Sequence, residues 1–292
     1  MISVAEAFQK FKSKLELTKT ESQDAQKRHT DVRSCLKEAF DVERDILTGS
    51  YSRHTKTKPL KDIDAFFILG EDEQWRRDQP PIDVLDAFER CLRDEYDDVE
   101  PNRRCITVEF AKAYQTEEEG GQILSVDAVP AFVTSRGYEI PDRVLGQWVE
   151  TDPEVHADQA TKKNKALDGD WKPLVKMIKK WNQTAGKPIK PSFLIEVMAQ
   201  DLIDPPFSTY PDEIINFFSA AQESIYEEWP DPAGLGPPVS DQMTAEKKSQ
   251  ACEALRDAER IAVRAQRAEE TGKVSDALSL WRQLFGNYFP LR

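Results

Sequence analysis

Apolar residues recur at intervals of three and four along much of this chain, a period that indicates amphipathic helices. Residues 4 to about 38 are predicted to form one helix, with an apolar stripe through Phe8, Phe11 and Leu15. Residues 80–96 carry the same period and follow a proline pair suited to a helix start. We therefore expect a long helix at the N-terminus and a second helix between strands.

Short apolar runs bounded by charged or turn-forming residues predict strands in the same part of the chain. They cover residues 41–50, 62–69, 103–111 and 123–133, and a turn over residues 117–121 separates the last two. Strands that alternate with a helix favour a small mixed sheet covered by helices.

The pattern changes near residue 150, beyond which it is mainly helical and interrupted by prolines. Seven prolines between residues 204 and 240 indicate irregular connections around one short helix, and a long helix is predicted from Thr244 to Glu270. The sequence predicts an α+β protein with a mixed lobe over residues 1–150 and a helical lobe over residues 151–292. The N-terminal helix is left open to extend to the second lobe.

Composition narrows the classes of function. The chain has 292 residues, a net charge of -13 and a mean hydropathy of -0.63, and its N-terminus lacks the pattern of a signal peptide. We expect a cytoplasmic protein that does not enter a membrane. The negative net charge argues against binding of duplex nucleic acid as the main activity, because such binding depends on Lys and Arg side chains that neutralise phosphates. Four scattered cysteines and three histidines do not suggest a zinc site.

Carboxylates at the start of one predicted strand suggest a metal site. Asp62 and Asp64 are two residues apart, so they share one face of the strand while Ile63 lies on the other. Asp127 stands in a second apolar strand, where an uncompensated charge is unfavourable. Magnesium prefers carboxylate oxygens and relieves the repulsion between them. The simpler interpretation of the two-aspartate pair is an exposed strand start.

A glycine-serine turn precedes this pair. Gly49 and Ser50 end the first predicted strand, and their backbone amides and hydroxyl suit phosphate oxygens. A basic segment over residues 53–61 links them to Asp62. Gly-Ser alone is only a turn. The Gly-Ser pair, the basic segment and the two aspartates together are a more specific indication of a site for a metal-bound phosphate.

Residues 49–69, GSYSRHTKTKPLKDIDAFFIL, resemble the signature of polymerase-beta-like nucleotidyltransferases. That superfamily includes oligoadenylate synthetase, cyclic GMP-AMP synthase and the bacterial cyclic oligonucleotide synthases (CD-NTases) of CBASS anti-phage defence. The resemblance extends from about residue 40 to the C-terminus, through SVDAVPAF (125–132), LVKMIKKWN (174–182), KPSFLIEVMA (190–199) and DPAGLGPPV (231–239).

The resemblance implies a nucleotidyltransferase lobe that binds two Mg²⁺ ions, with Mn²⁺ as a substitute. Asp62 and Asp64 are expected to hold both ions and Asp127 one of them, so these three are the expected catalytic and metal-binding residues. Gly49 and Ser50 are expected to bind the nucleotide triphosphate.

The second lobe is expected to contribute Lys176, Lys179 and Ser192 to the same triphosphate. Lys176, Lys179 and Lys180 share the polar arc of a predicted amphipathic helix, for which a solvated face is the simpler interpretation. For Lys180 we expect solvation. His54 is expected to be a loop residue.

The function implied is the joining of ATP, GTP or both into a cyclic di- or trinucleotide second messenger, with release of pyrophosphate. A separate effector would read the product, and regulatory or conjugating proteins encoded nearby remain open as partners. A linear 2'-5' oligoadenylate or RNA-end nucleotidyltransferase is the first alternative. An inactive nucleotide-binding scaffold is the second.

Overall fold

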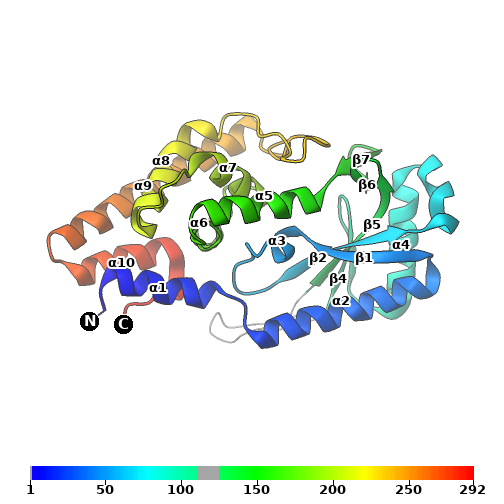
Figure 1. The fold of residues 1–292 in the computed structure, drawn as a ribbon, viewed down its shortest axis with the longest axis horizontal. Helices are drawn as coiled ribbons and strands as arrows, with labels where there is room; N and C mark the ends of the chain where they lie inside the picture. The colour runs from blue at the N-terminus through cyan, green and yellow to red at the C-terminus, as the bar shows by residue number, and fades with distance from the viewer. Residues whose placement is uncertain (1, 111–124) are drawn as a thin grey trace. The chain divides into compact units, whose positions relative to one another are not determined.

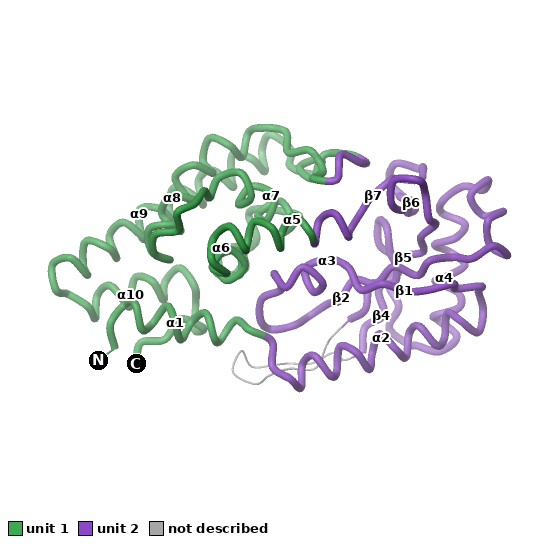
Figure 2. Tube along the Cα trace, viewed as in Figure 1, with its two compact units in different colours: residues 1–16, 158–232, 237–292 green, residues 17–157, 233–236 purple. Residues whose placement is uncertain are grey.

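The computed structural model describes residues 2–110 and 125–292 (Figure 1). The chain divides into two compact units (Figure 2): unit 1 comprises residues 1–16, 158–232 and 237–292, and unit 2 comprises residues 17–157 and 233–236. The predicted turn over residues 117–121 lies outside the described residues, as do the adjoining ends of the two predicted strands.

Unit 2 holds the sheet. Its described elements are, in chain order, α2 (Lys19–Ala39), β1 (Val42–Thr48), α3 (Gly49–Ser52), β2 (Asp62–Leu69), the 3-10 helix η1 (Glu71–Asp78), α4 (Pro81–Glu95), β3 (Val99–Pro101), β4 (Ile106–Glu109), β5 (Ser125–Thr134), β6 (Gly137–Asp142) and β7 (Gln147–Thr151).

Unit 1 is helical in the residues that the structure describes. Its elements are α1 (Val4–Leu15), most of α5 (Pro153–Ala166), α6 (Trp171–Thr184), α7 (Phe193–Leu202), α8 (Tyr210–Ser224), α9 (Ala245–Glu270), α10 (Val274–Phe285) and the 3-10 helix η2 (Gly286–Tyr288).

The single N-terminal helix predicted over residues 4–38 is wrong, because the chain forms two helices there. Thr18 accepts a hydrogen bond from the Glu21 backbone, and the Glu21 side chain accepts one from the Thr18 backbone. This reciprocal capping box starts α2 and satisfies amide groups that a continuous helix would have used internally. Glu16 is extended and ends α1, so the first helix belongs to unit 1 and the second to unit 2.

The described strands of unit 2 form one mixed sheet in the order β1-β2-β5-β4-β3, and β6 and β7 extend from β5. The strands β2 and β5 run parallel, whereas β1 and β4 run antiparallel to their neighbours. Because β5 is inserted between β2 and β4, residues more than sixty positions apart in sequence become neighbours.

The two faces of this sheet differ in what covers them. Side chains such as Ile63, Ala65 and Phe67 of β2 pack with α2 and α4 in one buried cluster. Phe66 and Ile68 point to the opposite face and pack with residues of β5, β6 and β7. Strand alternation therefore places Asp62 and Asp64 on the face opposite to α2 and α4.

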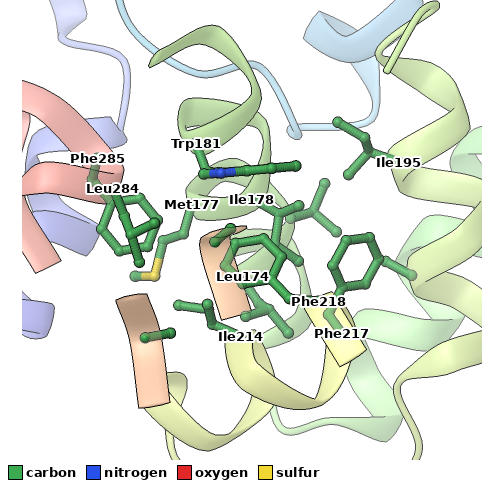
Figure 3. Packing of buried hydrophobic residues seen from close by; sticks show 14 of the residues in the cluster. Leu174, Met177, Ile178, Trp181, Ile195, Ile214, Phe217, Phe218, Leu284 and Phe285 are labelled. Carbon is green, nitrogen blue, oxygen red and sulfur yellow. The ribbon is translucent and has the colours of Figure 1, made fainter. Parts of the chain in front are cut away.

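Unit 1 has its own apolar core, centred on α6. Figure 3 shows side chains of α6 packed among those of α7, α8 and α10, and Trp181 lies 4.7 Å from Phe218 between ring centroids. Phe8 and Phe11 of α1 are fully buried in the same cluster, where Phe11 lies 4.8 Å from Phe285. This packing explains why the first sixteen residues belong to the helical unit. Among the described helices, none has the length and apolar character needed to cross a bilayer.

Two further elements differ from the expectations. The hairpin of β6 and β7 was not predicted, and α8 is a 15-residue helix where only one short helix was expected. Thr209 caps the first turn of α8 and Pro211 lies within it, so this proline starts the helix rather than breaking it.

Candidate active site

Four polar side chains form a row across four neighbouring strands of unit 2. In the strand register Thr48 pairs with Asp64, Asp64 pairs with Asp127, and Asp127 pairs with Thr107. Asp62 lies two residues before Asp64 on the same face and pairs with Ser125. The sheet therefore brings the three sequence-predicted aspartates together.

Gly49 packs directly against this row. It begins the short helix α3 with a backbone φ of 64°, a conformation that favours glycine. A Cβ atom placed on Gly49 would lie 1.8 Å from Asp64 Oδ2, so only glycine fits here. The predicted Gly-Ser turn is in fact the first turn of α3.

Ser50 organises the basic segment that follows α3. The backbone amides of Thr55 and Lys56 both donate to the Ser50 carbonyl over 3.0 Å. This closed loop returns Lys56 toward the sheet, where its Nζ lies 2.6 Å from Asp62 Oδ1. His54 is an exposed loop residue with a left-handed backbone, as expected.

The acidic row carries a substantial electrostatic cost. Burial first, and then the negative charge of Asp64, raise the pKa of Asp127 to about 7. Burial and Asp127 likewise raise the pKa of the Cys105 thiol well above its ordinary value. A cation at this position would lower that cost, because it favours the charged form of every carboxylate around it.

The residues fit a hard divalent cation by chemistry but are not arranged as a finished ligand set. Within the described parts of the chain, no group of three or more His, Cys, Asp or Glu side chains is close enough to hold an ion as it stands. Asp62 is engaged by Lys56 instead. Carboxylate oxygens are nevertheless the ligands that magnesium prefers, and a cation among them would relieve their mutual repulsion.

The predicted triphosphate lysines lie on α6 in unit 1. Lys176 Nζ is 2.6 Å from Glu16 Oε2, and Lys179 Nζ is 2.5 Å from Glu196 Oε1. Glu196 is fully buried, whereas the Glu16 side chain is half exposed. The pair of Lys179 and Glu196 is therefore internal to the unit, whereas buried Lys176 pairs with a carboxylate that is half exposed to solvent.

The solvated helix face considered for these lysines is wrong. Lys176, Lys179 and Lys180 are each at most 5% exposed, and each has a partner within unit 1. Lys180, which we expected to be solvated, lies with Nζ 3.7 Å from the centroid of the Tyr288 ring. This cation–π contact gives Lys180 a structural role.

Ser192 directly precedes α7 and is exposed. Its side chain makes no capping hydrogen bond to α7. Ser192, Lys176 and Lys179 belong to unit 1, whereas the aspartates and the Gly49–Ser50 pair belong to unit 2.

Comparison with known proteins identifies the family. The sequence model of the Second Messenger Oligonucleotide or Dinucleotide Synthetase domain matches residues 2–164, more than half of the chain. This range contains the three aspartates and the Gly49–Ser50 pair.

Two curated relatives are named as synthases of cyclic nucleotides. A cyclic AMP-AMP-AMP synthase of an Acinetobacter strain is 28% identical over 95% of this chain and 83% of its own length. A probable cyclic nucleotide synthase of Bacillus cereus is 29% identical over 83% of this chain and 81% of its own length.

Solved structures share the fold. Escherichia coli CdnC, solved with ATP, gives a TM-score of 0.72 at 20% identity and covers 99% of both chains. Bradyrhizobium diazoefficiens CdnG, solved with GTP, gives a TM-score of 0.74 at 15% identity over 96% of this chain and 95% of its own. The predicted fold class, enzymatic activity and family are confirmed. This chain belongs to the Second Messenger Oligonucleotide or Dinucleotide Synthetase family and is a bacterial nucleotidyltransferase that synthesises cyclic oligonucleotides.

Proposed function

We propose that the protein joins ATP, alone or with GTP, into a cyclic oligonucleotide that contains adenosine. The relative that matches 95% of this chain is named for a product made only of AMP. The structural observation that carries the proposal is the register in which Asp64 lies between Thr48 and Asp127, with Gly49 against its carboxylate. That arrangement suits transfer of a nucleotidyl group, for which positioning and charge stabilisation are the main requirements.

Asp62, Asp64 and Asp127 are the proposed ligands of two Mg²⁺ ions. When bound, such ions activate the attacking ribose hydroxyl and neutralise charge on the triphosphate and the leaving pyrophosphate. Lys56 holds Asp62 in the described structure, and we propose that it turns to the anionic nucleotide when the ions bind. The identity of the ion as magnesium, and the assignment of each aspartate to one or both ions, are part of this proposal.

Gly49 and Ser50 are proposed to bind the triphosphate through backbone amides and the Ser50 hydroxyl. Lys176, Lys179 and Ser192 are proposed to supply further contacts to the same triphosphate. No side chain acts as a nucleophile: a ribose hydroxyl of one nucleotide attacks the α-phosphorus of the next and pyrophosphate leaves. The same reaction within the linear product closes the ring.

The protein context is also proposed by analogy. Escherichia coli CdnC has been solved in a complex named for HORMA-deltaN, which supports the proposal that this chain also binds a protein partner. A separate effector that reads the product, a role in defence against phage and a cytoplasmic location complete the proposal.

Mass spectrometry of the product tests this function. The protein is incubated with ATP, GTP, CTP and UTP and with Mg²⁺, and the products are treated with phosphatase before analysis. We expect a phosphatase-resistant cyclic product that contains AMP. A linear product, from which the phosphatase has removed the terminal phosphates, would contradict ring closure, and a cyclic product without AMP would contradict the proposed substrate.

A further inference from the structure

Asp127 accepts a hydrogen bond from a chain of side chains that starts in the turn between β3 and β4. Thr107 Oγ1 donates to Asp127 Oδ1 over 2.5 Å, and Asn102 Nδ2 donates to Thr107 Oγ1 over 2.8 Å. An amide nitrogen only donates, so the Thr107 hydroxyl accepts from Asn102 and directs its own proton to Asp127. The two bonds therefore run in one direction, from Asn102 to the carboxylate.

The backbone fixes both members of this chain. Thr107 stands opposite Asp127 in the antiparallel pairing of β4 with β5, and it is only 8% exposed. The backbone N–H of Asn102 donates to the Cys105 carbonyl over 2.9 Å and closes the turn. The buried Thr107 side chain is thus held opposite the acid, and the turn holds the backbone of exposed Asn102 beside it.

Two arginines attach the same turn to β6. Arg103 Nε and Arg104 Nε each donate to Asp142 Oδ2 over 2.8 Å, and the Asp142 side chain is fully buried. Burial alone would raise the pKa of Asp142, but these hydrogen bonds and one from the Leu145 amide hold it below its ordinary value. Asp142 thus stays charged and holds the turn that carries Asn102.

We propose that Asn102 and Thr107 are positioning residues that fix the orientation of the Asp127 carboxylate for cation binding. With Oδ1 bonded to Thr107, Oδ2 is the oxygen left to hold a cation together with Asp64. Groups that orient a metal ligand in this way contribute to affinity without touching the ion. The inference rests on the proposed metal role of Asp127.

Cation binding without nucleotide tests the role of the hydroxyl. The affinity for Mn²⁺ is measured by electron paramagnetic resonance on the full chain with Thr107→Val, Thr107→Ser and Asn102→Ala. Thr134→Val is the matched control, because Thr134 also lies in the sheet and its hydroxyl bonds only a backbone amide of the hairpin turn among the hydrogen bonds described. Thermal unfolding confirms that each variant is folded.

We expect Thr107→Val and Asn102→Ala to weaken Mn²⁺ binding by about 10-fold, whereas Thr107→Ser and Thr134→Val stay near wild type. In activity assays the Mg²⁺ concentration for half-maximal rate should rise in the first two variants, with a smaller change in the KM for ATP.

Two results would overturn the inference alone: a Thr107→Val variant that binds Mn²⁺ as tightly as wild type, or a Thr107→Ser variant as weak as Thr107→Val. Asp127→Asn separates this failure from that of the proposed function. Unchanged Mn²⁺ binding by Asp127→Asn would remove Asp127 from the ligand set, and the positioning role with it.

Discussion

Gly49 lies so close to Asp64 that a single added methyl group would come within 1.8 Å of the Asp64 carboxylate. The position of the glycine that starts α3 and the position of the Asp64 carboxylate therefore depend on each other. This contact links the loop proposed for phosphate binding to the residue proposed for metal binding.

Gly49→Ala is expected to lower the rate of synthesis by about 100-fold, because the clash shifts either α3 or the Asp64 carboxylate by about 1 Å. Gly146→Ala is the matched control: Gly146 has a similar positive φ of 65°, but its added Cβ would meet nothing within 4 Å. Both variants should lose about 1 to 2 kcal/mol of unfolding free energy from the left-handed backbone, and Gly49→Ala should lose more because of its clash with Asp64. Equal activity in the two would contradict the role of the contact.

Lys56 is expected to serve as the counter-charge of Asp62 when no cation is bound. In Lys56→Met the acidic row is less well compensated, so Mg²⁺ should raise the melting temperature more than it does in wild type. The additional stabilisation by Mg²⁺ should be below about 1 kcal/mol of unfolding free energy, because the Asp62 side chain is 43% exposed. Exposed Lys61→Met is the control. Equal Mg²⁺-induced shifts in wild type and Lys56→Met would argue against an exchange of Lys56 for a cation.

The buried pair of Lys179 and Glu196 separates stability from nucleotide binding. Lys179→Met removes the buried ammonium that lies 2.5 Å from the fully buried Glu196 carboxylate and should cost about 3 kcal/mol or more in urea unfolding. Adding Glu196→Gln should restore most of that stability. If Lys179 also contacts the triphosphate, the double variant will still have a raised KM for ATP. Recovery of both properties would restrict Lys179 to a structural role.

His29 predicts how stability depends on pH. Burial lowers its pKa below the ordinary value of 6.5, and nearby Asp45 offsets this only in part. The unfolded chain therefore binds the proton more readily than the folded one, so this contribution to stability is complete above about pH 6.5 and is lost as the pH falls. Thermal unfolding from pH 8 to pH 5 should show a smaller decrease in His29→Gln than in wild type. Parallel curves would exclude His29 as the source.

The sequence was sufficient to place Asp62, Asp64 and Asp127 on strands, but not to identify the side chains that contact them. Alternation placed Asp62 and Asp64 on one face, and the apolar context singled out Asp127. The pairing of Asp127 with Thr107 depends on β5 lying between β2 and β4, which no local pattern reveals. Thr107 is visible as a polar residue between Ile106 and Val108, but only the register gives it a partner.

The lysines of α6 show a second limit. Their period suggested a solvated arc, yet the partners that allow their burial come from Glu16, Glu196 and Tyr288, which are distant in sequence. The break between α1 and α2 was readable in principle, since Thr18 and Glu21 have the spacing of a capping box. The apolar stripe through Phe8, Phe11 and Leu15 does not reveal this break.

The double variant Asp62→Asn with Asp64→Asn tests the central claim most directly. Its turnover of labelled ATP with Mg²⁺ is compared with that of wild type, and thermal unfolding checks its fold. We predict that product formation falls by at least ~1000-fold, since several kcal/mol of charge stabilisation is lost, while the melting temperature does not decrease. Undiminished synthesis by the folded double variant would contradict the assignment of these aspartates.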